Sequence, residues 1–156
     1  MNSKSILAFL LFLFVSSSAF SQLNNTLLTG SIGQTAIDMG KIVRYDSNGN
    51  IVVAGRFGNT PDFDLGPGVF NIAEWSLYDI FVAKYSASGA LIWAKGFTGP
   101  TGSQKEIADL IIDANNNMYL TGKFSGTMDF DPGVGQDLRV SNVSWNTFLI
   151  KMDLSS

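Results

Sequence analysis

Short apolar runs, separated by small and polar residues, follow one another along most of this chain. The runs are rich in Val, Ile, Phe, Tyr and Trp, and Gly, Asn, Ser or Asp bounds each of them. Such runs are typical of β-strands, and the Asn and Gly residues between them favour tight turns. Because no stretch shows a sustained helical period with caps, we expect an all-β fold. The pattern predicts strands at Ile51–Phe57, Val69–Ala73, Asp79–Ser86, Ala90–Phe97, Ile107–Asp113, Met118–Phe124, about Asp137–Val140, and Thr147–Met152.

The pattern also repeats, with a constant offset of 67 residues. The offset places each of six residues on the same residue type: Gly55 on Gly122, Phe57 on Phe124, Asp62 on Asp129, Asp64 on Asp131, Gly66 on Gly133, and Gly68 on Gly135. Each unit of such a repeat buries its apolar face only against a neighbouring unit. We therefore expect the two copies to form the same sheet, with Phe57 and Phe124 both buried.

Four strands per unit, with Trp93 in the core near the end of the fourth, predict the blades of a β-propeller. Known blades repeat every 40 to 50 residues or so, and the surplus here is expected in loops. The repeat region is 22–156, with units at about 34–100 and 101–156, and the second unit lacks its last strand. Because ring closure takes about four to eight blades, two units predict an open or partial propeller, or a fragment of a longer propeller protein.

The segment Leu27–Gly33 can be aligned with the end of a fourth strand. A sheet that lacks its last strand exposes an edge that pairs readily with another chain. We expect this segment to complete the last blade of a neighbouring copy, or else the chain to aggregate. Other propeller repeats or protomers are thus the expected partners, through the open sheet edge.

Four blocks of the chain carry a resemblance to a known family: Gly49–Phe57, Asp62–Gly68, Asp79–Gly89 and Leu91–Lys95. Together they resemble the bacterial secreted β-propeller repeat family, often called SBBP-type repeats, over about residues 27–156. The resemblance implies a propeller-like module in exported or cell-surface bacterial proteins, and it implies no reaction. The chain departs from the family in having two units, the second of them incomplete.

Residues 1–21 have the layout of a secretory signal peptide. Lys4 gives a positive start, Ile6–Val15 is an unbroken apolar run, and Ala19-Phe20-Ser21 is placed for cleavage. A membrane anchor is the alternative, but a span needs about 20 apolar residues. We therefore expect a secreted or cell-surface protein with no membrane span after cleavage.

Composition excludes several classes of function. Without Lys4, the chain has nine basic and thirteen acidic residues, and it has no cluster of Lys and Arg that could bind a phosphate backbone. Nucleic acid is therefore not an expected partner. The chain has no Cys and no His. Disulfides, Ser-His and Cys-His nucleophile pairs, and zinc sites built on His or Cys are therefore excluded. A bound metal would need oxygen ligands.

Two Asp-Phe-Asp motifs carry the candidate metal ligands: Asp62 and Asp64 in the first copy, and Asp129 and Asp131 in the second. Alternate residues of an extended segment share a side, so both carboxylates of a motif can converge. With backbone carbonyls and water, they can supply the oxygens that Ca²⁺ requires. The alternative is a turn, because Asp before Gly caps backbone N–H groups. The pattern alone leaves both interpretations open.

The same carboxylates offer a weaker case for catalysis. A glycoside hydrolase uses one pair of carboxylates, whereas this pair occurs twice and indicates a scaffold. We therefore expect a non-enzymatic module for scaffolding or binding, and the alternative is a carbohydrate-active propeller enzyme.

Trp75 and Trp145 lie in polar turns and form the candidate ligand surface, for a polysaccharide or a cell-surface protein. Lys84 and Lys151, at matching positions, are expected to face solvent.

Overall fold

The computed structural model describes five parts of the chain, residues 30–33, 38–73, 76, 79–142 and 144–155. The predicted signal peptide and Trp75 lie outside them. The strands of these parts are β1 (Met39–Tyr45), β2 (Ile51–Phe57), β3 (Asp79–Tyr85), β4 (Leu91–Phe97), β5 (Gln104–Ile112), β6 (Asn117–Ser125), β7 (Thr127–Asp129), β8 (Leu138–Val140) and β9 (Asn146–Asp153). The described residues form no helix, so none that is long and apolar enough to cross a membrane.

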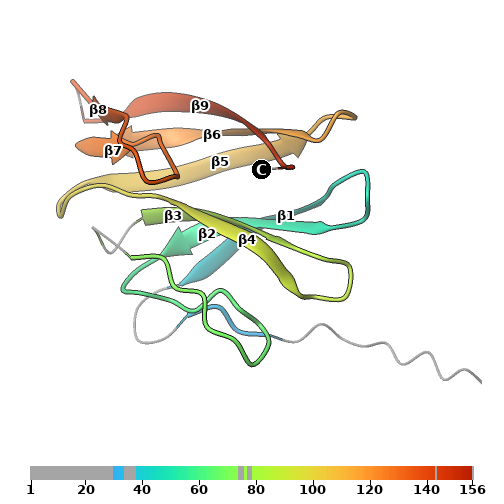
Figure 1. Cartoon of the computed structure of the whole chain (residues 1–156). Coiled ribbons are helices and arrows are strands. Elements are labelled where there is room, and N and C mark those ends of the chain that lie inside the picture. Colours follow the sequence, from blue (N-terminus) through green and yellow to red (C-terminus); the bar gives the residue numbers. More distant parts are fainter. Residues whose placement is uncertain (1–29, 34–37, 74–75, 77–78, 143, 156) are drawn as a thin grey trace, which may run out of the picture.

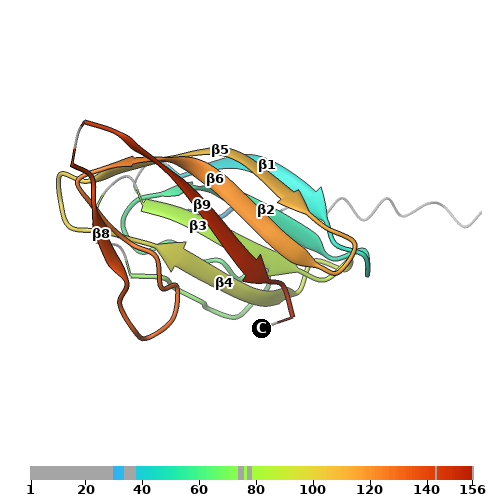
Figure 2. The same ribbon diagram turned by 90° about the horizontal axis from the view of Figure 1, so that it is seen from above.

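Two antiparallel sheets are stacked face to face (Figure 1). The first sheet has the order β1-β2-β3-β4 and the second has the order β5-β6-β9, while β7 and β8 form a separate hairpin. Figure 2 shows the second sheet lying over the first. The predicted fold class is confirmed: the described chain is all-β, and its two open sheets correspond to a four-stranded blade and a blade that lacks its fourth strand.

The two copies adopt the same strand register. Gly55 lies opposite Phe81 in the first sheet, and Gly122 lies opposite Phe148 in the second. The prediction that Phe57 and Phe124 are both buried is confirmed. The constant offset in the sequence therefore reflects a constant pairing of strands.

Alternation along the strands gives each sheet two faces, which we name front and back. The front of the first sheet carries Ile51, Val53, Phe57, Phe81 and Tyr85, and the front of the second carries their counterparts Met118, Leu120, Phe124, Phe148 and Met152. The back of the first sheet carries Val52, Ala54, Ile80 and Val82, matched in the second by Tyr119, Thr121, Thr147 and Leu149. One core cluster joins the back of the first sheet to the front of the second. Trp93 packs against this cluster, as predicted.

A buried ion pair joins the two sheets at one end. Lys105 Nζ of β5 lies 2.7 Å from Asp79 Oδ1 at the start of β3, and both side chains are fully buried. The other oxygen of Asp79 accepts a hydrogen bond from Ser76 N at 3.0 Å. Burial lowers the pKa of Lys105, and the neighbouring Asp79 carboxylate opposes that shift. Removing one partner of such a pair leaves a buried charge uncompensated.

Lys84 corrects a prediction, because it does not face solvent. Its side chain is buried between the sheets, where Nζ lies 2.9 Å from Asp46 Oδ2 and donates to Leu154 O at 2.9 Å. Lys151, at the matching position of the second sheet, is exposed as predicted. The two lysines differ because the back of the first sheet is covered by the second sheet, whereas the back of the second sheet is an outer face.

Two strand assignments also need correction. Val69–Ala73 is not a strand, and within it only Asn71 forms a bridge, with Asp62. The segment folds back on the aspartate loop instead, where Phe70 N donates to Asp62 Oδ1. The first strand of the blade is instead β1, for which we predicted none. On β1 only Ile42 is buried, so the strand lacks the apolar alternation that is typical of a half-buried strand.

The segment Leu27–Gly33 is described only at Gly30–Gly33, and those residues are not in a strand. Gly30 instead lies against Leu65, and Ile32 packs on the front of the first sheet. Gly33 has a φ of 136°, which an extended strand does not allow. In Figure 1 this blue segment lies beneath the first sheet, beside the green loop.

The close approach at Gly55 generates a prediction. A Cβ there would clash with Met39 O and with the Phe81 ring. We expect Gly55→Ala to lower the free energy of unfolding by about 1 to 3 kcal/mol through overpacking. Gly40→Ala on the neighbouring strand is the matched control, since its Cβ would meet only Val53 at 3.9 Å. Equal stability of the two variants in urea denaturation would contradict this packing.

Asp46 generates a prediction about acid stability. Burial raises its pKa, but hydrogen bonds from Asn50 and Lys84 outweigh burial and lower the pKa from 3.8 to about 2. A lowered pKa stabilises the fold above pH 3.8, and this contribution is lost as the pH falls toward 2. We expect Asp46→Asn to cost about 2 kcal/mol at neutral pH and much less near pH 2.

The measurement is chemical denaturation at a series of pH values. Asp113→Asn is the matched control, because Asp113 occupies the same turn in the second copy without a buried lysine partner. A pH-independent difference between wild type and Asp46→Asn would contradict the assigned contribution.

Candidate functional site

The first Asp-Phe-Asp loop is organised by hydrogen bonds from the backbone to its own aspartates. Asp62 Oδ1 accepts from Asp64 N and from Phe70 N, both at 2.9 Å. Asp64 Oδ1 accepts from Gly66 N at 2.8 Å. Each carboxylate thus closes a turn, as Asp side chains commonly do.

The second loop repeats these bonds at the same offset. Asp129 Oδ1 accepts from Asp131 N at 3.0 Å and from Asp137 N at 2.8 Å. Asp131 Oδ1 accepts from Gly133 N at 2.8 Å. In each loop the second glycine, Gly68 or Gly135, lies so close to the other oxygen of Asp64 or Asp131 that a Cβ would clash. The repeated glycines are therefore required by the packing of the carboxylates.

The phenylalanine between the two aspartates points the other way, into the front of its own sheet. The Phe63 ring lies 5.0 Å from the Phe81 ring, and the Phe130 ring lies 5.5 Å from the Phe124 ring, in edge-on arrangements. Tyr85 donates its hydroxyl hydrogen to Phe63 O at 3.0 Å. Burial raises the pKa of Tyr85, and the charges of Asp64 and Asp62 raise it further. The loop therefore covers part of an apolar face.

A cation site needs more oxygen ligands than one loop supplies from side chains. Among the residues that the structure describes, no three Asp or Glu side chains gather as metal ligands would. Each loop still brings two carboxylates within one turn, and Ca²⁺ also takes backbone carbonyls and water. Calcium binding at Asp62, Asp64, Asp129 and Asp131 stays a prediction, and the hydrogen bonds support the turn interpretation.

Trp145 lies at the rim of a polar pocket. Its side chain is 37% exposed, and Lys123 Nζ lies 4.6 Å from its ring centroid. Arg56, Gln104, Lys105 and Glu106 complete this cavity of 240 Å³. The Lys123 ammonium, 3.1 Å from Glu106 Oε2, lowers the pKa of Glu106. The arrangement offers an aromatic face beside groups of both charges; Trp75, its predicted companion, lies outside the described residues.

Three further cavities can be compared with a hydrolase cleft. They measure 280, 240 and 500 Å³. Each of them, and the Trp145 pocket, is lined by one carboxylate, which is Asp38, Glu106 or Asp137. Glycoside hydrolysis needs two carboxyl groups about 5 to 9.5 Å apart across one cleft. None of these four cavities offers that pair.

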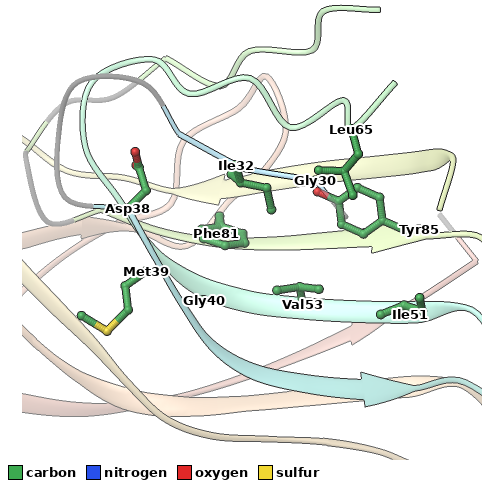
Figure 3. Close-up of a pocket in the computed structure, with 10 residues that line it drawn as sticks. All are labelled: Gly30, Ile32, Asp38, Met39, Gly40, Ile51, Val53, Leu65, Phe81 and Tyr85. Atoms are coloured by element: carbon green, nitrogen blue, oxygen red, sulfur yellow. The ribbon is translucent and has the colours of Figure 1, made fainter. Parts of the chain in front are cut away.

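The cavity of 280 Å³ opens on the front of the first sheet (Figure 3). Ile51, Val53 and Phe81 line one side of it, and Ile32 and Leu65 cover it from the other. Sequence reasoning missed this site. The repeat alone gives no signal for it, because both copies are apolar at these positions, and only the structure shows that Met118 and Leu120, the counterparts of Ile51 and Val53, are fully buried.

Comparison with known proteins gives one relative of interest. The chain is 33% identical over 114 residues to an uncharacterized WD repeat-containing protein of Acanthamoeba polyphaga mimivirus. The match covers 64% of this chain and 8% of the relative, so the chain spans only a small part of that protein's length. No family model matches the chain, and no solved structure matches it.

This similarity agrees with the architecture. WD repeats build four-stranded propeller blades, and the first sheet has four antiparallel strands. Both observations point to a repeat module of the β-propeller type.

Calcium separates the two interpretations of the aspartate loops. If the aspartates act as turn formers, Asp62→Ala costs about 1 to 3 kcal/mol through unsatisfied N–H groups, while Asp62→Asn, which keeps an acceptor oxygen, costs less. We expect thermal unfolding of both variants and of wild type to be unchanged by millimolar calcium. A calcium-dependent rise in the melting temperature of wild type that Asp62→Asn abolishes would establish a metal site instead.

Proposed function

We propose that this chain is a secreted, non-enzymatic β-propeller repeat module that binds or scaffolds other molecules at the cell surface. The observation that carries the proposal is the stacking of two equivalent sheets, back on front, with an outer face left at each end of the stack. Repeat stacks of this kind act through extended surfaces. The N-terminal segment 1–21 supports export, and the resemblance to SBBP-type repeats supports a bacterial, cell-surface setting.

The non-enzymatic part of the proposal is supported by the distribution of acidic groups. The aspartates that occur in pairs, such as Asp62 and Asp64, hold backbone N–H groups of their own turns. The four cavities described above carry one carboxylate each. A carbohydrate-active enzyme remains the alternative, and it requires a cleft where two carboxylates converge.

Ligand binding is assigned to the pocket of Trp145. An exposed indole ring stacks on apolar faces of sugars and peptides, and its edge tolerates water. Arg56 and Glu106 beside it supply hydrogen-bond donors and acceptors. A polysaccharide or a cell-surface protein is the class of ligand that such a surface suits.

Affinity electrophoresis in gels that contain soluble polysaccharides tests this proposal. We expect at least one polysaccharide to retard the wild-type chain, and Trp145→Ala to lose most of the retardation because stacking contacts dominate such sites. Val140→Ala, an exposed apolar residue outside the pocket, is the matched control. Release of reducing sugars by the wild type would favour the enzyme alternative, and retardation that survives Trp145→Ala would place the site elsewhere.

A further inference from the structure

The two outer faces of the sheet stack differ from their covered counterparts in a systematic way. On the front of the first sheet, Val43 is 53% exposed and Tyr45 is 68% exposed. Their counterparts on the second sheet, Leu110 and Ile112, lie in or against the core. The front of the first sheet is therefore built for a cover that the chain itself supplies only in part.

The back of the second sheet also exposes apolar side chains at positions that are buried on the back of the first sheet. Leu149 is 71% exposed and Ile111 is 55% exposed. Val82, the counterpart of Leu149, is fully buried because the second sheet covers it. An exposed apolar strand residue at a position that stacking normally buries indicates an unfilled contact.

We propose that a second copy of this chain covers the front of the first sheet with the back of its own second sheet, head to tail. The contact repeats the one already made within the chain, in which a back meets a front. This inference rests on the proposed function and deepens it, because it names the partner of the repeat module. The cavity of 280 Å³ on this front lies beneath Ile32 and Leu65 (Figure 3). The partner's strands would therefore pack beside these two residues, over the exposed Val43 and Tyr45.

Polar groups at the proposed contact are compatible. Within the chain, Lys84 donates to Leu154 O across the interface. Between copies, the equivalent donor is Lys151, which is exposed, and the equivalent acceptor is the carbonyl of Ala87 in the next copy. Lys151 Nζ lies 5.6 Å from the Tyr119 ring centroid, so the ammonium is already on the face that would be covered.

The position of the buried ion pair is also compatible. Asn146 occupies the place of Asp79, and Asp38 occupies the place of Lys105. Asp38 Oδ1 accepts a hydrogen bond from Gly58 N at 3.2 Å. An amide can donate to a carboxylate, and no like charges meet there. At this position the contact between copies therefore lacks the buried charge pair and places a neutral amide opposite the carboxylate.

The geometry limits the size of the assembly. A head-to-tail contact between identical chains forms a ring when its rotation closes. Rings of about four to eight blades are known, so two blades per chain predict two to four copies.

The test measures the mass of the full chain in solution by light scattering, expressed with its own N-terminus so that any leader is removed by the host. We expect wild type to have the mass of about two to four copies. Val43→Lys on the front and Leu149→Lys on the back should each give monomers, and Tyr45→Lys is a second front variant should the first fail to fold. Val134→Lys, in an exposed loop outside both sheets, should keep the wild-type mass.

Mixing the variants tests the head-to-tail arrangement itself. The Val43→Lys chain keeps its back and the Leu149→Lys chain keeps its front, so an equimolar mixture should form a one-to-one complex and grow no further. A monomeric wild type, a mixture that stays monomeric, or assembly that survives both substitutions would overturn the proposal. Binding of a polysaccharide by a monomeric wild type would retain the proposed function and reject this interface.

Discussion

The packing of one sheet's back against the next sheet's front determines most of this structure. The front carries rows of phenylalanine, such as Phe124 and Phe148, that one loop residue cannot cover alone. Covering them takes a second sheet, and that sheet then has two apolar faces of its own. The stacking removes Lys84 and Lys105 from water, and each must therefore meet a carboxylate or carbonyl inside the interface.

The repeat made the strand register predictable, but other features depend on contacts that the sequence does not display. Phe57 and Phe124 could be placed because both the offset and the alternation apply to them. The burial of Lys84 could not be predicted from the sequence. Its partner Leu154 lies 70 residues away, and the lysine occupies a position between apolar residues, as an exposed residue of a half-buried strand does. The first strand was missed for the opposite reason: Ile42 is its only buried residue, so the strand shows no apolar alternation.

In the aspartate loops, the sequence pattern identifies the residues but does not determine their role. Asp62 and Asp129 were identified from the repeat, and both hold the same two kinds of N–H donor. A cation site and a turn require the same residue types at the same spacing, so the sequence could not distinguish them. The structure gives a reason why both copies keep the motif: the turn places Phe63 or Phe130 on the front of the sheet, while the aspartates accept the hydrogen bonds of the turn's own backbone.

The back of the second sheet carries more polar residues than the back of the first, as expected for a face that is exposed to water. Where the first sheet has Ala54 and Ile80 on its covered back, the second has Thr121 and Thr147 on its outer back. Thr121 donates its hydroxyl hydrogen to Phe148 O at 2.8 Å, so this polar group is satisfied within its own sheet. Interfaces between separately folded units are more polar than the core within one unit. The back of the second sheet can therefore be exposed to water and still pack against another chain, because covering it leaves few polar groups without hydrogen-bond partners.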